Sequence, residues 1–478
     1  MKKYYDIMSI GNKMYPIGDD YMFTSIEFAN YKSFKHLFLD MQQSGQPKNL
    51  IAIYGENGAG KSNIVSAFMN LALSIRTYKN QIELAQLESK MGNANQDEAE
   101  IDANQTLLKM LRNKVIHSSN DDSVLSVFRS YYMINSNDPM RIIYKFRIDE
   151  HDGSYELIFK KDKGKIYLAS ETLKYLIKKA TGTIFSINKA NFSSKPTFKL
   201  SPSLFNTNVI PIFKDQIERF WGKHTFLALF YNFQSASNES YVDDNVSKNF
   251  IKVFDDLSQI SIKTDRAAAM QVFKSLLHGD LYRGIVTNDE RGNANLDNTE
   301  LAINKYFIPL YSDILELKYK RDIIDDNRLK YDLYESKRID GEIIKVPFVL
   351  ESHGTKQLLE LLPLLLNAKA GDTVVIDEID SGIHDLLINR IVENISEDLQ
   401  GQLIFTTHDT QLMREIAPSS LYVIRSDANG RKRVEPLPSI AKIKANNNVQ
   451  KLYLEGYFDG IPYTDDVDFD DILDGIED

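Results

Sequence analysis

The chain has 478 residues, of which 43% are hydrophobic and 26% are charged, with a formal net charge of −10 at pH 7. This composition is typical of a globular protein of two or three domains. The acidic balance argues against a generally basic nucleic-acid-binding surface, although not against a local basic patch. The absence of cysteine excludes a disulfide framework and a thiolate metal site. We find neither an apolar run long enough to span a membrane nor an apolar signal-peptide core, so we expect a cytoplasmic protein with no membrane partner.

The first predicted elements are two strands, a glycine-rich loop and a helix. Residues 23–28 (FTSIEF) alternate as a strand does, and residues 49–54 (NLIAIY) form a short apolar run that is typical of a buried parallel strand. Apolar residues at helical spacing follow Lys61. The polar segment 79–122 then predicts an exposed helical excursion.

The rest of the chain shows strand signals, then a mainly helical pattern, then an alternation of both. Strand-forming stretches between 126 and 168, separated by Asn-Asp-Pro, Asp-Gly and Lys-Gly turns, predict an antiparallel meander. The pattern between 173 and 341 is mostly helical. From 346 to 425 strand and helix signals alternate, which predicts a parallel sheet.

These signals predict an α/β fold in which a head of nucleotide-binding type is split between the two ends of the chain. We expect the following segments: the N-terminal portion of the head at 20–78, the helical excursion at 79–122, an antiparallel β lobe of the head at 123–172, an inserted helical lobe at 173–341, the C-terminal portion of the head at 342–440, and a C-terminal segment with an acidic tail at 441–478.

The loop GENGAGKS between the second strand and the following helix satisfies the phosphate-loop pattern G-x-x-x-x-G-K-[ST]. Its glycines allow backbone N–H groups to point at phosphate oxygens, and the helix N-terminus adds its dipole. Lys61 would neutralise the β- and γ-phosphates of ATP, and Ser62 would bind Mg²⁺. A chance match in a chain of this length has odds of about one in a hundred. We expect nucleotide contacts from Gly55, Asn57, Gly58, Gly60, Lys61, Ser62 and Asn63.

The apolar strand TVVI ends in two carboxylates, Asp377 and Glu378. A carboxylate at a strand end can reach Mg²⁺ directly or through water, which predicts Asp377 as a metal ligand together with Ser62. Glu378 lies one residue further and could act as the general base on the attacking water. The same pattern occurs at ordinary helix-to-turn junctions, so its functional interpretation depends on the phosphate loop.

Two more segments carry groups suited to a phosphate site. Ser352 and Gly354 open an apolar helix, whose N-terminus can bind an anion, although simple helix capping also accounts for Ser352. His408 ends the apolar strand LIFTTH. If that strand is the parallel neighbour of the strand that ends at Asp377, His408 lies beside the same phosphate and could sense its loss.

The order of these motifs resembles that of ABC-type ATPase heads. The element NYKSF at 30–34, Asn63 after Gly-Lys-Ser, and the long separation of Ser62 from Ser352 are more similar to SMC, RecF and OLD-like ATPases than to transporter heads. Asp380 in DSGIH resembles the D-loop aspartate. The resemblance implies a P-loop ABC-type head with a parallel core sheet, an antiparallel β lobe and the inserted helical lobe.

Three stretches, ESHGTKQLLELLPLLL, VVIDEIDSGIH and LYLEGYFDGIP, are similar to stand-alone bacterial ATPases described as AAA ATP-binding proteins. These act in phage-defence and abortive-infection modules, and the ATPase of the PARIS system is one such type. The resemblance implies an ATPase that serves as sensor or scaffold, with a toxin effector encoded nearby and a phage trigger protein as partners. His353 and Asp385 depart from the small residue and the proline that are usual in these motifs.

The resemblance also implies a homo-oligomer, at least a head-to-tail dimer. ATP would be held by the phosphate loop of one copy and by Ser352 and Gly354 of another. Glu378 would catalyse hydrolysis, and His408 and Asp380 would signal it. Such a nucleotide-dependent interface can be bistable.

Two other functions stay open. The first is a RecF-like or SMC-like DNA repair or recombination ATPase, for which residues 172–214, with lysines and aromatics but no acidic residue, would contact DNA. A core-packed segment with a solvated basic face is the structural alternative for this stretch. The second is a nucleotide-locked assembly scaffold in which hydrolysis is incidental. The tail, with nine acidic residues of twenty at 459–478, is either a solubilising end or a docking site for a basic partner.

Overall fold

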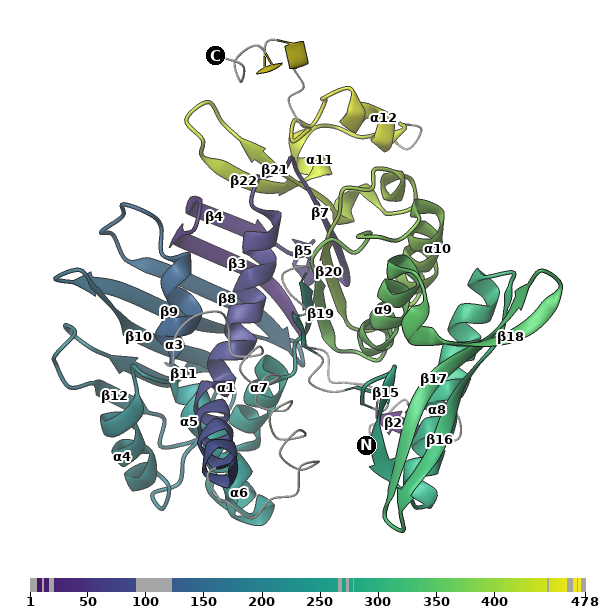
Figure 1. Ribbon diagram of the computed structural model, residues 1–478. Coiled ribbons are helices and arrows are strands. Elements are labelled where there is room, and N and C mark those ends of the chain that lie inside the picture. The colour runs from purple at the N-terminus through teal and green to yellow at the C-terminus, as the bar shows by residue number, and fades with distance from the viewer. Residues whose placement is uncertain are drawn as a thin grey trace.

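The computed structural model describes the backbone of residues 7–10, 13–16, 21–91, 123–264, 269–271, 275–277, 279–444, 447–461, 467–470 and 472–473. Two seven-stranded sheets lie side by side, and a third, four-stranded sheet stands apart beside the second (Figure 1). The mixed α/β fold predicted from the sequence is confirmed. No helix in the described ranges has both the length and the apolar character needed to cross a bilayer.

The first large sheet is antiparallel and has the strand order β12-β11-β10-β9-β8-β3-β4. Two of its hairpins turn through pairs of residues with positive φ, as two-residue hairpins prefer, at Asp149-Glu150 and Lys163-Gly164. The expected meander is present from Met140 onward, but residues 126–131, where strand signals also predict a strand, are helical, because α3 and a short 3₁₀ turn occupy them. The strands are β3 (Met22–Tyr31), β4 (Phe34–Asp40), β8 (Met140–Ile148), β9 (His151–Asp162), β10 (Lys165–Leu176), β11 (Thr181–Asn188) and β12 (Thr197–Leu200).

The second large sheet has the order β14-β13-β19-β20-β7-β21-β22, with parallel pairing from β13 through β21 and an antiparallel strand at each edge. Its central strands are short and buried on both faces, as in other covered parallel sheets. The strands are β7 (Leu50–Tyr54), β13 (Ser261–Thr264), β14 (Ala269–Gln271), β19 (Thr373–Ile376), β20 (Gln402–Thr406), β21 (Leu421–Ser426) and β22 (Lys432–Pro436).

The two faces of the parallel sheet belong to different hydrophobic cores. In β7, Ile51 and Ile53 pack in the core shared with α1 and the antiparallel sheet, whereas Ala52 and Tyr54 pack in the core shared with α9 and α10. The helices are α1 (Lys61–Met91), α3 (Val124–Phe128), α4 (Ile210–Phe220), α5 (Phe226–Ala236), α6 (Glu239–Asn245), α7 (Lys248–Ser258), α8 (Glu290–Phe307), α9 (His353–Lys369), α10 (Asp385–Ser396), α11 (Leu437–Ile440) and α12 (Val449–Leu454).

The segment 173–341 differs from the expected helical lobe, because it contains many strands. Strands β11 and β12 of this segment extend the antiparallel sheet, helices α4 to α7 follow them, and β13 joins the parallel sheet. The remainder, with α8, forms most of the four-stranded sheet of β15 (Arg283–Thr287), β16 (Ile314–Asp325), β17 (Arg328–Ile339) and β18 (Glu342–Pro347). The mixed charges of β16 and β17 suggest a solvated helix in the sequence, but they alternate with buried Tyr and Leu residues at a period of two.

The expected helical excursion at 79–122 is described only over its first residues. Helix α1 continues through this boundary to Met91, which makes it 31 residues long. The remainder of the excursion, residues 92–122, lies outside the described residues.

A buried glutamate joins the antiparallel sheet to the helices that cover it. The carboxyl group of Glu171 in β10 accepts hydrogen bonds from Trp221 Nε1 (2.6 Å), Tyr155 Oη (2.9 Å) and the backbone N–H of Phe226 (2.7 Å) at the start of α5. Its side chain is fully buried. Desolvation outweighs these donors and raises the pKa of Glu171 from 4.5 to about 7.

This pKa predicts a pH-dependent stability. Between about pH 4.5 and 7 the folded chain retains a proton on Glu171 that the unfolded chain releases, so the free energy of unfolding should fall as pH rises through this window. Glu171→Gln removes the titration and should reduce that fall by up to about 3 kcal/mol. Urea unfolding at pH 5 and pH 8 measures it, with Glu397→Gln, at an exposed position after α10, as control. An unchanged pH dependence in Glu171→Gln would contradict the assignment.

Candidate functional site

The phosphate loop connects β7 to α1 through glycines at positions that a side chain would strain or crowd. At Gly60, φ is +113°, and an added Cβ would lie 2.6 Å from Cζ of Phe34. Gly58 also has positive φ, +77°. The ring of Phe34, at the start of β4, is buried against the loop. The loop shape that exposes backbone N–H groups to a phosphate is therefore built into the fold.

Lys61, the first residue of α1, is curled back onto the loop that precedes it. Its Nζ donates to the carbonyl oxygens of Gly55 (2.7 Å) and Glu56 (3.3 Å). Its side chain is buried. Desolvation lowers the pKa of Lys61, and the nearby carboxylates of Glu378 and Asp377 oppose this shift. The lysine of the loop and the paired carboxylates therefore belong to one electrostatic site.

Three neighbouring parallel strands bring the predicted groups to one edge of the sheet. Strand β20 lies between β7 and β19 and pairs in parallel with both. The phosphate loop follows β7, Asp377 and Glu378 follow β19, and His408 follows β20. The sequence prediction that the strand before His408 is the parallel neighbour of the strand before Asp377 is confirmed.

Thr406, the last residue of β20, fixes both carboxylate residues. Its Oγ1 donates to Asp377 Oδ1 (2.6 Å) and accepts from the backbone N–H of Glu378 (2.8 Å). Glu378 adopts φ of +49°, an uncommon conformation for a residue other than glycine that concentrates at functional sites. The motifs of the sequence do not single out Thr406, and its place just before Thr407 and His408 is the only local signal for it.

Asp380 and His408 are also joined. The backbone N–H of His408 donates to Asp380 Oδ2 (3.3 Å). The other carboxylate oxygen of Asp380 is buried without a hydrogen-bond partner among the described residues. Desolvation and then the charge of Lys61 lower the pKa of His408, so its imidazole is neutral at pH 7 and can accept or donate one hydrogen bond.

The residues predicted for Mg²⁺ fit a site that is completed by substrate. Ser62 begins the first turn of α1, and Asp377 is almost fully buried at the end of β19. The described residues contain no cluster of three or more His, Cys, Asp or Glu side chains that could hold a metal alone. Mg²⁺ in nucleotide sites uses one or two protein ligands together with phosphate oxygens and water, so such a cluster is not needed.

The N-terminus of α9, which contains His353 and Gly354, packs against Gly382 in the segment at 380–384 (called the D-loop segment below). Ser352 caps α9, and its Oγ accepts from the N–H of Thr355 (3.2 Å). A Cβ on Gly354 would lie 2.3 Å from the carbonyl oxygen of Gly382, so only glycine fits there. The ring of His353 covers Gly382 in turn. Within one chain the contacts of Ser352 agree with its simple capping interpretation.

Glu351, the residue before Ser352, is held by the four-stranded sheet. Its carboxylate pairs with Lys337 of β17 at 2.8 Å. It also lies against Glu335 of β17, whose carboxyl group is buried. Burial, and then the neighbouring Glu351 carboxylate, raise the pKa of Glu335 well above its usual range. The N-terminus of α9 is therefore fixed to the lobe that carries β15 to β18.

The lysine-rich and aromatic stretch at 172–214 is core-packed over most of its length. Its aromatics Tyr175, Phe185, Phe205 and Phe213 are buried in the core beneath the antiparallel sheet, where bases cannot stack on them. Phe192 differs, because it is 39% exposed and has the Lys189 ammonium over its ring. The structure therefore favours the solvated-face alternative for most of this stretch, with Phe192 as the exception.

The acidic tail is described only at 467–470 and 472–473 beyond residue 461, and the rest of it lies outside the described residues. Its apolar residues Val467, Phe469, Ile472 and Leu473 are exposed.

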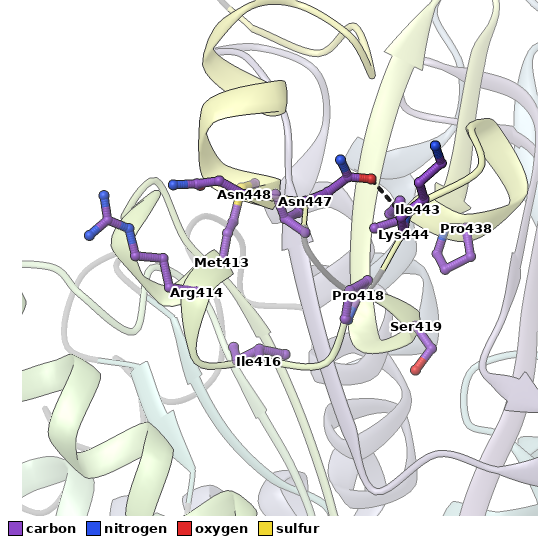
Figure 2. Close-up of a pocket in the computed structure, with 11 residues that line it drawn as sticks. Met413, Arg414, Ile416, Pro418, Ser419, Pro438, Ile443, Lys444, Asn447 and Asn448 are labelled. Carbon is purple, nitrogen blue, oxygen red and sulfur yellow. Dashed lines mark hydrogen bonds between the residues drawn. The ribbon is translucent and has the colours of Figure 1, made fainter.

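A separate hollow lies among the C-terminal elements. Figure 2 shows this cavity of about 630 Å³, which is lined by residues that include Met413, Arg414 and Asn448. None of the predicted site residues lines it. It is therefore distinct from the phosphate site.

The fold has the features of the α/β P-loop class that the sequence predicts. A glycine loop lies between a strand and a helix, an Asp-Glu pair follows the second strand along the sheet, and a histidine follows the strand between them. The antiparallel sheet beside the parallel sheet completes this architecture (Figure 1).

Comparisons with known proteins give the particular similarities. A family model described as AAA domain, putative AbiEii toxin, Type IV TA system matches residues 245–414, less than half of the chain. No curated protein matches the chain. Among solved structures, the SmcHead bound to the C-winged helix domain of ScpA is 14% identical, with 86% of this chain and 97% of that chain covered and a TM-score of 0.39.

A second solved structure is the Smc head domain with an extended coiled coil bound to the C-terminal domain of ScpA, derived from Pyrococcus furiosus. It is 13% identical, with 87% of this chain and 96% of that chain covered and a TM-score of 0.38. With TM-scores this low, the assignment of the fold rests on the strand order and loop positions described above.

The position of Thr406 leads to a prediction that includes its own control. Thr406→Val should leave the Asp377 carboxylate and the Glu378 N–H without their shared partner, which costs about 1–3 kcal/mol and loosens the site. Thr373→Val, at the start of β19, replaces a buried hydroxyl that has no partner among the described residues and should be neutral or stabilising. Thermal unfolding and nucleotide affinity measure both effects. Equal behaviour of the two variants would refute the bridging role.

Proposed function

We propose that the chain is an ATP-binding and ATP-hydrolysing head that serves as sensor and scaffold in a bacterial antiphage module, where it controls a toxin effector. The observation that carries the ATPase function is the convergence of Lys61, Asp377, Glu378 and His408 at the carboxyl ends of three adjacent parallel strands. Ligands in parallel α/β sheets bind at this edge.

Each group has a chemical task in this proposal. Lys61 leaves the carbonyl groups of Gly55 and Glu56 and binds phosphate oxygens, and the loop N–H groups bind the remainder. Ser62 and Asp377 would hold Mg²⁺, which supplies positive charge to the phosphates when bound. Glu378 accepts a proton from the attacking water. Neutral His408 hydrogen-bonds the terminal phosphate, while Asp380 holds its backbone.

We further propose that Ser352 and Gly354 complete the ATP site of a second copy. Support comes from the surface around them: Leu350, just before Ser352, is 71% exposed, and Leu386, just after the D-loop segment, is 65% exposed. Two large exposed apolar side chains beside an anion-binding helix end favour a protein interface there. The homo-oligomer is then at least a head-to-tail dimer that forms around ATP.

The role in defence rests on the comparisons and on the motifs. The matched family is described by abortive-infection and toxin–antitoxin terms, and its region covers Ser352, Glu378 and His408. We therefore propose a toxin as partner, with a phage protein as trigger. The assignment to the PARIS type of ATPase rests on the resemblance of the motifs alone.

Glu378→Gln tests the proposed chemistry. The variant should bind ATP as the wild type does but hydrolyse it at least about 100-fold more slowly, because an amide cannot accept the proton from water. Equilibrium binding and single-turnover phosphate release are the measurements, with Glu393→Gln on α10 as a matched control. Wild-type turnover in Glu378→Gln would show that the base lies elsewhere.

Ser352→Arg tests the composite site. In the Glu378→Gln background, ATP should drive the chain into a dimer, and an added Ser352→Arg should block dimerisation because the larger side chain fills the space of the partner's phosphates. Light scattering coupled to gel filtration measures the mass with and without ATP. Ser193→Arg, on an exposed turn of the antiparallel lobe, is the control. ATP-dependent dimers of the Ser352→Arg variant would argue against this interface.

A further inference from the structure

A second lysine lies on the phosphate loop, and it comes from the far end of the sequence. Lys432 is the first residue of β22, after the turn at 427–431. Its Nζ donates to the carbonyl oxygen of Gly58 at 2.7 Å and to Ser33 Oγ at 3.3 Å. Gly58 lies between Gly55 and Lys61, so the loop has one lysine at its end and another over its middle.

The residues around Lys432 are themselves connected by hydrogen bonds and packing. Ser33 Oγ also accepts from Asn63 Nδ2 at 3.3 Å, which links the turn at 30–34 to the first turn of α1. The Lys432 ammonium lies 5.9 Å from the centre of the Phe34 ring, the same ring that packs against Gly60. The 30–34 turn and β22 therefore both contact the phosphate loop.

The two lysines are alike in being partly desolvated. Desolvation lowers the pKa of both; Glu378 and Asp377 chiefly oppose this shift at Lys61, and Glu56 opposes it at Lys432. Both ammonium groups are bound by neutral backbone carbonyl oxygens of the loop. A hydrogen bond from an ammonium group to an anionic oxygen is roughly twice as strong as one to a neutral acceptor. A partly desolvated ammonium in this position is therefore poised to exchange the carbonyl for a phosphate.

We propose that Lys432 is a second phosphate-binding lysine of this site, which contacts the polyphosphate of a bound nucleoside triphosphate from the C-terminal hairpin. The inference rests on the proposed ATP-binding function and adds a ligand that no phosphate-loop pattern contains. Its charge adds to that of Lys61, so its contribution grows with the number of phosphates. A lysine that only braced the loop would support all nucleotides equally.

Lys432→Met tests the proposal, because methionine keeps an apolar stem beside Phe34 and removes only the ammonium group. With fluorescent ATP, ADP and AMP analogues, we expect the Kd for ATP to rise about 10-fold, the Kd for ADP less, and the Kd for AMP little. Lys432→Arg, which restores the charge, should recover most of the affinity for ATP. Lys442→Met, at an exposed position in the same C-terminal region, should behave as the wild type.

The outcomes separate this inference from the proposed function. A wild-type chain that binds no ATP removes both. ATP binding that is lost in Lys61→Ala but unchanged in Lys432→Met overturns the inference alone. Lys432→Met could also lose affinity for ATP, ADP and AMP equally, or unfold at a lower temperature without nucleotide to an extent that accounts for the loss. Either result would show that Lys432 only supports the loop, and would overturn the inference.

Discussion

The parallel pairing of β20 with both β7 and β19 is the constraint on which the site depends. Register places Ile53 beside Thr406 and Ile376 beside Phe405, so the three strands end almost level. The residues that follow the strands are therefore brought together by the strand pairing itself. Thr406 uses this alignment directly, because a side chain at the end of the middle strand reaches the Asp377 carboxylate and the Glu378 N–H on its neighbour. A shift of one residue in β20 would turn Thr406 to the other face of the sheet and separate these groups.

Local spacing in the sequence predicts much of this arrangement. Short patterns predict the glycines and Lys61, the carboxylates after an apolar strand, and the histidine after the next strand, and chain order predicts which strands are neighbours. Short patterns do not predict the contacts of Thr406, Ser33 and Lys432, because each contact joins distant segments. Lys432 meets Gly58 across 374 positions, and no local pattern identifies such a contact. The helical prediction for the lobe of β15 to β18 is wrong because the closely spaced charges of this lobe are also typical of a solvated helix.

The four-stranded lobe is joined to the candidate site by a continuous chain of contacts. Lys337 and Glu335 of β17 hold Glu351, and Glu351 directly precedes the Ser352 cap of α9. In turn, Gly354 and His353 pack against Gly382. The position of the α9 N-terminus therefore depends both on the four-stranded sheet and on the segment that follows β19. Apolar residues on this lobe, such as Ile323 and Ile343, are exposed.

The C-terminal segment contacts the strand that leads into the phosphate loop. Tyr453 of α12 packs edge-on against Tyr54, the residue before Gly55, and its hydroxyl donates to the carbonyl of Gly460. Arg425 of β21 pairs with Asp459 at 2.6 Å. The stretch LYLEGYFDGIP is therefore a support for the phosphate loop. Strand β22 carries Lys432 and pairs with β21 in one hairpin, so the contact of Lys432 with the loop and the pairing of Arg425 with Asp459 come from adjacent strands.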